Sequence, residues 1–410
     1  MLLVCVTPPI KAGPADAKVP ASFAGIADLL RVLKHLKFAL NVAFFVRHRY
    51  FLHPKSGNLQ EVSQEIVYIY TQNAQPPEIP MLLTFTCLDP RKTKKLQMQR
   101  MLETAGFVRF VSFAPLGFAR YQETNERAAK ALETAIKKPR GAFMRWAKLS
   151  LLKRQYAGCR AYFERTPNTV AVAWNGLNGT RRVFMDAAKD AGNRTLFFEL
   201  APFADRITID PKGVNFANSL PREIAPYIAW AASSGANLQS WHGLRDTITQ
   251  RQPATPHAGA DIAPRRNAPF IFVPLQVPGD SQLRLNGGAF KTVKQFVDTI
   301  LDVAHNCPDG WQIRIKEHPS AEPFVKAAIN ASGASNVVLD NITDTFEQVK
   351  QSELVVTVNS SVGLEAMFFN KSVVACGDCF WAMEGIAASA KTPQDIADVL
   401  ADPGTVTFNA

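Results

Sequence analysis

Three polar side chains, those of Asp280, His318 and Ser360, stand where apolar runs typical of buried strands come to an end. The first of these runs starts at Phe270 and is almost unbroken, as in a strand that is buried on both faces of a parallel sheet. Open parallel sheets bind their ligands just beyond the carboxyl ends of the strands. We therefore expect a carboxylate, an imidazole and a hydroxyl to meet at one edge of one sheet.

Each of these side chains has a chemical and a structural interpretation. Asp280 could contact a ligand, or it could simply close the Pro-Gly turn that precedes it. His318, which a following proline keeps extended, could neutralise a leaving phosphate together with Lys316, or it could be a turn residue at a solvated strand end. Ser360 and Ser361 could cradle a phosphate at a helix N-terminus, and N-capping by the same hydroxyls is compatible with that role.

Further polar residues surround these positions. Gln276 and Gln282 flank the Pro-Gly turn, and Glu365 lies one turn into the helix that follows the two serines. The carboxylate of Glu365 could accept hydrogen bonds from two ribose hydroxyls. In the first half of the chain, Asn175 and Glu199 also fall just past predicted strand ends, so they belong to the candidate site as well.

Strands and helices that could position these residues alternate along the chain. Strands are expected at Met1–Thr7, Pro80–Leu88, Phe107–Phe113, Thr169–Trp174, Thr195–Phe198 and Ile207–Ile209, and then near Phe270, Trp311, Val337, Leu354 and Ser372. Helices are expected at Ala21–Arg49, Lys92–Thr104, Lys137–Tyr156, Arg181–Ala191, Thr292–His305 and Pro323–Ala331, and from Val362 onward. This alternation predicts an α/β fold with doubly wound parallel sheets.

The length of 410 residues is sufficient for two domains of ordinary size. A polar segment, rich in Pro, Ala and Gly in its second half, reads as a linker at 241–268. The predicted boundaries are therefore 1–240 for an N-terminal α/β domain with basic helices, 241–268 for the linker and 269–410 for a C-terminal Rossmann-like domain.

The formal net charge of +11 is concentrated in two stretches without acidic residues, 29–60 and 134–163. Such fields attract phosphate groups in nucleic acid, anionic lipid or a sugar nucleotide. The helix expected at 137–156 combines cations with apolar residues: Arg145, Lys148, Lys153 and Arg154 with Phe143, Trp146, Leu149 and Leu152. It is either an ordinary amphipathic helix or a membrane-surface helix, and the same holds for the helix at 21–49. Nucleic-acid binding ranks last, because no recognised binding module accompanies the charge.

The six cysteines are scattered, and the single pair Cys376-Gly-Asp-Cys379 is weak evidence for metal or redox chemistry. We expect all six to be reduced, as in a cytoplasmic protein. The first residues lack the features of a secretory signal, and no window supplies the ~18 uninterrupted apolar residues of a spanning helix. A soluble or membrane-peripheral protein is therefore expected.

Three segments, Gln276-Val-Pro-Gly-Asp280-Ser-Gln282, Lys316-Glu-His318-Pro319 and Asn359-Ser-Ser-Val-Gly-Leu-Glu365, resemble motifs of the bacterial capsule polysaccharide biosynthesis and export family. Glu199 and the run Asp210-Pro-Lys-Gly-Val-Asn215 resemble a Phe-x-Glu segment and a D-x-x-G-V-N run of the same family. The resemblance covers about residues 170–375. The His-Pro and Ser-Ser elements also occur in bacterial sialyltransferases, so the first segment is the most discriminating.

This resemblance implies a GT-B fold, with an N-terminal acceptor domain and a C-terminal CMP-sugar domain, and a retaining β-Kdo transferase that uses CMP-Kdo. By the resemblance, Asp280 is the nucleophile, Glu199 the base for the acceptor hydroxyl, and His318 a group that steadies the departing phosphate. The implied substrate-binding residues are Gln276, Gln282, Arg284, Lys316, Asn359, Ser360, Ser361, Glu365 and Asn175. No cofactor or metal is expected, because cationic side chains and a helix terminus already face the phosphate.

The expected partners are CMP-Kdo, a lipid or Kdo-terminated acceptor in capsular linker synthesis, an anionic membrane surface and other capsule assembly proteins, but not nucleic acid. The expected location is cytoplasmic, at the inner face of the inner membrane. Two alternatives stay open. An inverting CMP-sialyltransferase-like enzyme would need a base but no nucleophile, and a non-catalytic capsule export adaptor would bind CMP without transferring sugar.

Overall fold

The computed structural model describes residues 83–88, 92–203, 206–235 and 268–408, with short segments at 50–52, 59–61, 242–243, 245 and 248. The strand expected at Met1–Thr7, the helix expected at Ala21–Arg49 and most of the linker expected at 241–268 lie outside the described residues. The three domain boundaries therefore stay predictions. Two short strands, β1 (Tyr50–Leu52) and β2 (Leu59–Glu61), pair antiparallel.

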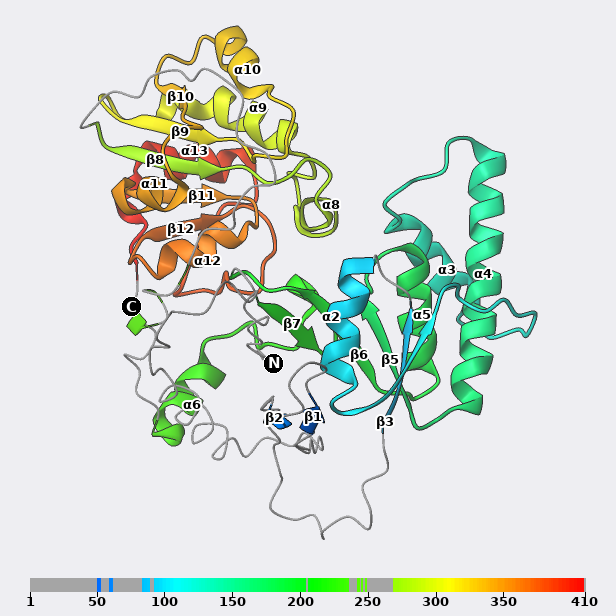
Figure 1. The fold of residues 1–410 in the computed structure, drawn as a ribbon. Coiled ribbons are helices and arrows are strands. Elements are labelled where there is room, and N and C mark those ends of the chain that lie inside the picture. The colour runs from blue at the N-terminus through cyan, green and yellow to red at the C-terminus, as the bar shows by residue number, and fades with distance from the viewer. Residues whose placement is uncertain are drawn as a thin grey trace.

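The N-terminal unit is built on a five-stranded sheet with the order β4-β3-β5-β6-β7 (Figure 1). Its strands are β3 (Leu83–Leu88), β4 (Gly106–Val111), β5 (Thr169–Trp174), β6 (Thr195–Leu200) and β7 (Ile207–Asp210). All neighbours are parallel except β6 and β7. The helices of this unit are α2 (Lys92–Leu102), α3 (Thr124–Glu133), α4 (Ala142–Arg165), α5 (Gly179–Asp190) and α6 (Ala225–Ser234), with a 3-10 turn at Asn215–Ala217.

The buried strand β5 shows why helices cover both faces of this sheet. Its alanines, Ala171 and Ala173, join the core cluster formed with α3, α4 and α5, whereas Val170 and Val172 join the cluster formed with α2. Successive strand residues point to opposite faces, so a run that is apolar at every position requires a helical layer on each side.

The C-terminal unit is built on a six-stranded, fully parallel sheet with the order β10-β9-β8-β11-β12-β13. Its strands are β8 (Phe270–Pro274), β9 (Gln312–Lys316), β10 (Val337–Leu339), β11 (Leu354–Thr357), β12 (Ser372–Ala375) and β13 (Ala388–Ser389). Counted within the unit, this is the Rossmann order 3-2-1-4-5-6. The helices are α8 (Ser281–Asn286), α9 (Val293–Val303), α10 (Val325–Ser332), α11 (Thr345–Gln351), α12 (Ser361–Met367) and α13 (Pro393–Ala401), with 3-10 turns at Ala304–Asn306 and Pro403–Thr405.

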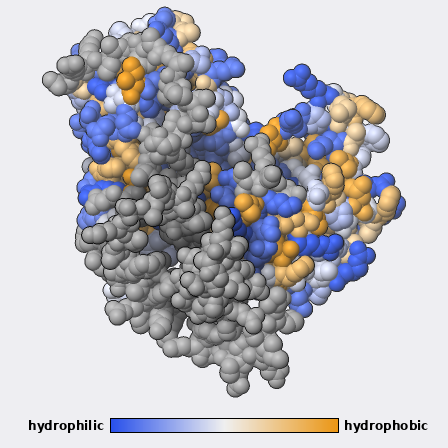
Figure 2. All heavy atoms as spheres, in the orientation of Figure 1, coloured by the Kyte–Doolittle hydropathy of each residue, from blue (hydrophilic) through white to orange (hydrophobic). Residues whose placement is uncertain are grey.

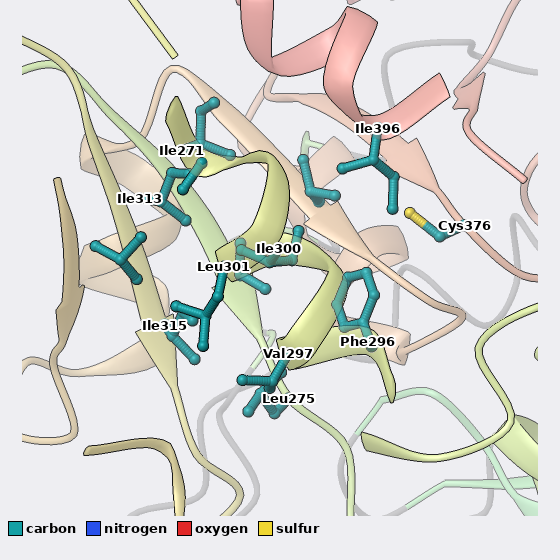
Figure 3. Close-up of a cluster of buried hydrophobic side chains, with 14 of the residues drawn as sticks. Ile271, Leu275, Phe296, Val297, Ile300, Leu301, Ile313, Ile315, Cys376 and Ile396 are labelled. Carbon is teal, nitrogen blue, oxygen red and sulfur yellow. The ribbon is translucent and has the colours of Figure 1, made fainter. Parts of the chain in front are cut away.

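The largest core cluster of the C-terminal unit lies between its sheet and the helices α9, α10 and α13. Figure 3 shows Ile271 and Ile313 of the sheet packed with Phe296 and Ile300 of α9 and with Ile396 of α13. The opposite face of the sheet packs against α11 and α12 in a second cluster. The α/β fold with doubly wound sheets is thus confirmed.

The strand predictions within the described residues agree with the structure to within a few residues. Pro274 is the last residue of β8, which lies in the middle of the sheet between β9 and β11. A proline at the last residue is tolerated there because the ladder continues through Leu275 N, which donates to Lys316 O at 2.9 Å.

The two units lie side by side, and the space-filling view shows the molecule hollowed between them at its upper edge (Figures 1 and 2). Contacts between described residues of the two units include hydrogen bonds and a pair of aromatic rings. Arg284 of α8 donates to the N-terminal unit, and the rings of Phe203 and Phe368 meet edge-on with centroids 5.4 Å apart. Two Rossmann-like units arranged in this way form a GT-B-like architecture, as predicted.

Candidate active site

The strand order of the C-terminal sheet reverses between β8 and β11, and the candidate residues lie in the loops that follow these two strands. Gln276 Nε2 donates to Asn359 Oδ1 at 3.0 Å, and Asn359 N approaches Gln276 Oε1 at 3.4 Å. Both side chains are buried. This pair of amides ties the two loops together at the switch point of the sheet.

Asp280 lies beside this amide pair. Its Oδ1 accepts from Gln282 N at 2.8 Å and so caps the N-terminus of α8, while its Oδ2 lies 3.4 Å from Gln276 Nε2. The preceding Gly279 has a φ of +78°, which glycine adopts without strain. The carboxylate is half-buried. Because the capping bond uses only Oδ1, Oδ2 faces Gln276 at the switch point of the sheet.

The amide of Asn359 also braces α8. Its Nδ2 donates to Gln282 O at 3.1 Å, and the side-chain Oε1 of Gln282 accepts from Asn286 Nδ2 at 3.1 Å. Gln276, Gln282 and Asn359, all predicted to bind substrate, are therefore brought together around Asp280. In this structure their hydrogen bonds position the loops, and their contacts with a substrate stay predictions.

The Lys-Glu-His-Pro segment divides into residues with different environments. Lys316 is buried, and its Nζ donates to Asn341 O at 2.9 Å and Thr343 O at 2.6 Å. An ammonium engaged by these carbonyls fixes the loop after β10. To contact a phosphate as predicted, the Lys316 side chain would have to leave these two carbonyl groups. We therefore assign the contact with the phosphate to His318.

Glu317 was not among the predicted residues, although it organises this segment. Its Oε1 accepts from Phe324 N and Val325 N at the start of α10, and its Oε2 accepts from Asn341 Nδ2 at 3.1 Å. The carboxylate is buried and caps the helix. His318 follows it, half-buried, and its Nδ1 accepts from Ser320 N at 3.1 Å.

The serines after β11 begin a short helix, as the sequence predicted. Ser360 is the N-cap of α12 and accepts from Val362 N at 3.2 Å. Ser361 is half-buried at the first helical position, and Glu365 is buried within the helix. The N-capping interpretation is confirmed for Ser360, and a phosphate cradle at this helix start remains a prediction.

Glu199 is the penultimate residue of β6, and three hydrogen-bond donors orient its carboxylate. Its Oε1 accepts from Trp174 Nε1 and from Leu200 N, each at 3.0 Å, and its Oε2 accepts from Asn175 Nδ2 at 2.8 Å. Asn175 adopts a φ of +64° immediately after β5, a conformation that asparagine tolerates better than most residues. The two predicted residues of the N-terminal unit are thus in direct contact.

A residue that the sequence analysis missed, Asn178, links this pair to the other unit. Asn178 Nδ2 donates to Asn175 Oδ1 at 2.6 Å, and Asn178 Oδ1 accepts from Arg284 NH2 at 2.9 Å. Asn178 is the N-cap of α5 but makes no side-chain cap bond, because its amide is used in this chain of contacts. We call the series Arg284, Asn178, Asn175 and Glu199 the amide relay.

Arg284 was predicted to bind substrate; in the structure its guanidinium lies between the two units, and its contact with a substrate stays a prediction. Besides Asn178, its guanidinium donates to Thr134 O and Ala135 O, both at 2.9 Å. These carbonyls follow the last residue of α3, where a cation is favourable. Arg284 therefore joins the helix that begins at Asp280 to the unit that carries Glu199.

The family-like run after β7 is a structural loop. The buried carboxylate of Asp210 accepts from four donors, namely Lys212 N, Gly213 N, Ser219 N and Ser219 Oγ, at distances of 2.7 to 3.1 Å. Its two oxygens are fully occupied within the loop. Asp210 therefore stabilises the conformation of this loop.

A surface pocket lies apart from these residues. It is lined by Arg245, Ile248, Phe346, Lys350, Phe369 and Lys371. It lies at the amino edge of the C-terminal sheet, because α11 ends and β12 begins there, whereas Asp280 and Ser360 follow strand ends at the carboxyl edge.

The five cysteines in the described part of the chain are free and buried. Burial raises the pKa of the Cys379 thiol to about 12 and raises that of Cys376 as well, so this pair is protonated at neutral pH and poorly reactive. Among the residues that the structure describes, no group of three or more His, Cys, Asp or Glu side chains could hold a metal ion.

The fold and the edge residues define a protein with a GT-B-like architecture. Its residues 244–398 match the model of the family described as capsule polysaccharide biosynthesis protein. The matched range contains Asp280, His318 and Ser360. The resemblance inferred from the motifs is thereby confirmed.

Protein FixF of Sinorhizobium fredii (strain NBRC 101917 / NGR234) is 33% identical over 218 residues, which are 53% of this chain and 50% of that protein. The chain thus spans about half the length of this curated relative. Thermosulfurimonas dismutans KpsC, a β-Kdo 2,7 transferase, superposes with a TM-score of 0.46 at 13% identity over 77% of this chain and 88% of its own. Its β-Kdo 2,4 transferase gives 0.43 at 14% over the same shares. Scores of this size transfer no residue roles.

Proposed function

We propose that the protein is a glycosyltransferase that moves Kdo from CMP-Kdo to a lipid or Kdo-terminated acceptor in the synthesis of a capsular polysaccharide linker. The observation that carries this proposal is the hydrogen-bonded set of Gln276, Asp280 and Asn359 at the switch point of the Rossmann-like sheet. Nucleotides bind at this place in such sheets, and the family match includes all three residues. The choice of CMP-Kdo rests on the motif resemblance.

The proposed reaction retains the anomeric configuration through two inversions. Asp280 attacks the anomeric carbon of Kdo as the bond to CMP breaks, which gives a covalent glycosyl-enzyme. The acceptor hydroxyl then attacks the same carbon, the bond to Asp280 breaks, and Glu199 takes the hydroxyl proton. We assign the attack to Oδ2 of Asp280, because a backbone N–H already holds Oδ1.

The leaving phosphate would be met by His318, by Ser360 and Ser361 and by the N–H groups at the start of α12. These donors stabilise the negative charge of the phosphate by hydrogen bonding, and the proposed reaction includes no metal ion or other cofactor. Glu365 is proposed to contact the ribose of CMP, and Asn175 acts here by orienting Glu199.

The proposed setting is the cytoplasmic face of the inner membrane. A lipid-linked acceptor lies in that surface, and a peripheral enzyme would reach it without crossing the bilayer. Other capsule assembly proteins would receive the product there. In the described part of the chain, no helix is long and apolar enough to span a membrane.

Mass spectrometry of the intact protein after incubation with CMP-Kdo tests the mechanism. We expect Glu199→Gln to accumulate an adduct of one Kdo, since the second step lacks its base, and Asp280→Asn to form none while still binding CMP. Asp298→Asn, at an exposed carboxylate of α9 that pairs with Lys294, is the matched control and should transfer Kdo like the wild type.

Three results would contradict this proposal. Transfer by Asp280→Asn at a near wild-type rate would exclude the covalent mechanism. Transfer from CMP-sialic acid with inversion and without an adduct would indicate the sialyltransferase-like alternative. Binding of CMP without transfer from either donor would indicate a non-catalytic capsule export adaptor.

A further inference from the structure

The connection between α3 and α4 and the first turns of α4 form a surface that we call the α4 tip, residues 136–146. Nearly every residue in it is exposed, including Ile136, Phe143, Met144 and Trp146. Phe143 and Trp146 are 72% and 64% exposed, and their rings stack on each other with centroids 6.0 Å apart. Large apolar side chains gathered in this way on a surface indicate an interaction site.

The charge of the α4 tip has a single sign. It carries Lys137, Lys138, Arg140 and Arg145, all exposed, and no acidic residue occurs between Glu133 and Glu164. Exposed aromatic rings among cations are the composition of segments that lie in the interface of an anionic bilayer. An acidic protein partner would need an apolar patch of its own to take up the rings, whereas a bilayer offers anionic headgroups and an apolar interior together.

The structure corrects which residues of α4 can face a lipid. Leu152 is fully buried, and Leu149 packs against the core cluster of α3, α4 and α5. Lys153 is half-buried, and the guanidinium of Arg154 lies 3.9 Å from the centroid of the Phe118 ring. The sequence had grouped all of these with Phe143 and Trp146, but the large apolar residues at the N-terminal end of the helix are the most exposed ones, whereas Leu149 and Leu152 face the core.

The α4 tip lies at the same edge of the N-terminal unit as the candidate active site. Because α4 leads directly into β5, the helix runs opposite to that strand, and its first turn lies toward the carboxyl edge where Asn175 follows β5. In Figure 1 this end of α4 extends beyond the sheet. Thr134 and Ala135, just before the tip, accept the hydrogen bonds of Arg284.

We propose that the α4 tip docks on an anionic phospholipid bilayer, with Phe143 and Trp146 inserted between headgroups and the four cations on lipid phosphates. This surface would bring the carboxyl edge of the N-terminal unit to the membrane. The presentation of a lipid-linked acceptor by this surface rests on the proposed function. The docking itself depends on exposure and charge.

The test is co-sedimentation of the full chain with vesicles of phosphatidylcholine alone or mixed with phosphatidylglycerol. We expect binding to the anionic vesicles that falls as salt is raised. Each cation near an anionic surface strengthens binding about fivefold, so Lys137→Ala with Lys138→Ala should weaken vesicle binding about thirtyfold. Phe143→Ala with Trp146→Ala should weaken it at least about tenfold through lost apolar burial.

Matched controls are available on other surfaces of the chain. Lys291→Ala with Lys294→Ala removes two exposed cations from the start of α9, and Phe107→Ala removes a ring that is 61% exposed at the opposite edge of the N-terminal sheet. Both should bind vesicles like the wild type. Because these assays contain neither donor nor acceptor, failure of the transferase proposal would leave their outcome unaffected.

Several results would overturn the docking proposal. The first is wild-type protein that does not bind anionic vesicles. The second is wild-type protein that binds neutral vesicles as well as anionic ones at every salt concentration. Unchanged binding by both α4-tip variants would place the contact elsewhere. A dimer in light scattering that is lost in Phe143→Ala with Trp146→Ala would show that a second copy covers this surface instead.

Discussion

Ser320 N donates to Nδ1 of His318 at 3.1 Å, and this contact selects the tautomer of the imidazole. A nitrogen that accepts a hydrogen bond cannot carry the proton of the neutral ring, so that proton resides on Nε2. The Nε2–H group is then a donor of fixed direction, beyond the end of β9. This geometry suits a neutral imidazole that donates to a phosphate oxygen.

His318→Ala should weaken CMP binding by ~1.5–3 kcal/mol, which is the usual loss when a hydrogen bond to a charged group is removed. Transfer should slow as well. Isothermal calorimetry with CMP measures the first effect. His305→Ala, at the 3-10 turn after α9, is the control and should bind CMP normally. An unchanged affinity for His318→Ala would leave His318 as a turn residue only.

The amide relay connects α8 of the C-terminal unit with β6 of the N-terminal unit through the loop after β5. Arginine can only donate and a carboxylate can only accept, so Arg284 at one end and Glu199 at the other fix the orientation of both amides between them. Asn178 must accept from the guanidinium and donate to Asn175, which in turn donates to Glu199. The loop after β5 is therefore set by a helix of the other unit.

Asn178→Asp separates the two functions of this relay. The new carboxylate still accepts from Arg284, but it has no N–H group for Asn175 Oδ1, so the support of Glu199 is lost. Loss of a hydrogen bond that supports a charged group costs ~1.5–3 kcal/mol. We therefore expect kcat for transfer to fall about tenfold to a hundredfold, while KM for CMP-Kdo changes little. Steady-state kinetics checks this split. A raised KM with normal kcat would refute the positioning role.

The packing of α3, α4 and α5 contains a polar contact within its apolar core. The hydroxyl of Tyr156 lies 2.6 Å from Glu123 Oε1 and 2.8 Å from Asp190 Oδ2, so one proton is shared between two carboxylates. Burial, followed by these two acceptors, raises the pKa of Tyr156. The hydroxyl thus stays protonated and serves as a donor between the helices.

Tyr156→Phe should lower the free energy of unfolding by ~1–3 kcal/mol, because two partly buried carboxylates lose their common donor. Urea denaturation followed by circular dichroism measures the change. The control is Tyr121→Phe, whose hydroxyl makes an exposed contact with Glu164, and it should stay within about 0.5 kcal/mol of the wild type. Equal effects of the two substitutions would contradict the assigned role.

At the scale of the whole molecule, the contacts of Arg284 and the ring pair of Phe203 and Phe368 set the two units against each other. Arg284 contributes three hydrogen bonds of 2.9 Å between the units. The residue lies one turn after Asp280, and its partners lie beside the residues that orient Glu199. The separation of the proposed nucleophile and base therefore depends on this contact.

Arg284→Met keeps the stem of the side chain and removes all three hydrogen bonds. We expect the radius of gyration measured by X-ray scattering to rise and transfer to fall at least tenfold, with CMP affinity within about threefold of the wild type. Lys291→Met is the control for loss of a cation. A large loss of CMP affinity at an unchanged radius would instead support the donor-binding role first inferred for Arg284.

The sequence by itself determined most strands of the two large sheets and the edge at which the polar side chains meet. The boundaries predicted for Thr169–Trp174 coincide with β5, since a buried strand is marked by its own apolar residues and by the turn after it. The placement of Asp280, His318 and Ser360 followed from the parallel topology alone, because every strand of such a sheet ends at the same edge. These features depend on short stretches of chain.

Only the tertiary structure decided which partners the long polar side chains select and which face of α4 is covered. Lys316 reaches carbonyls 25 and 27 residues away, and Arg284 reaches Asn178 across 106 residues. Leu152 is buried because α3 and α5 pack on that side of α4, whereas Trp146 lies beyond them. Side-chain partners and burial depend on elements distant in sequence, so no local pattern of residues contains them.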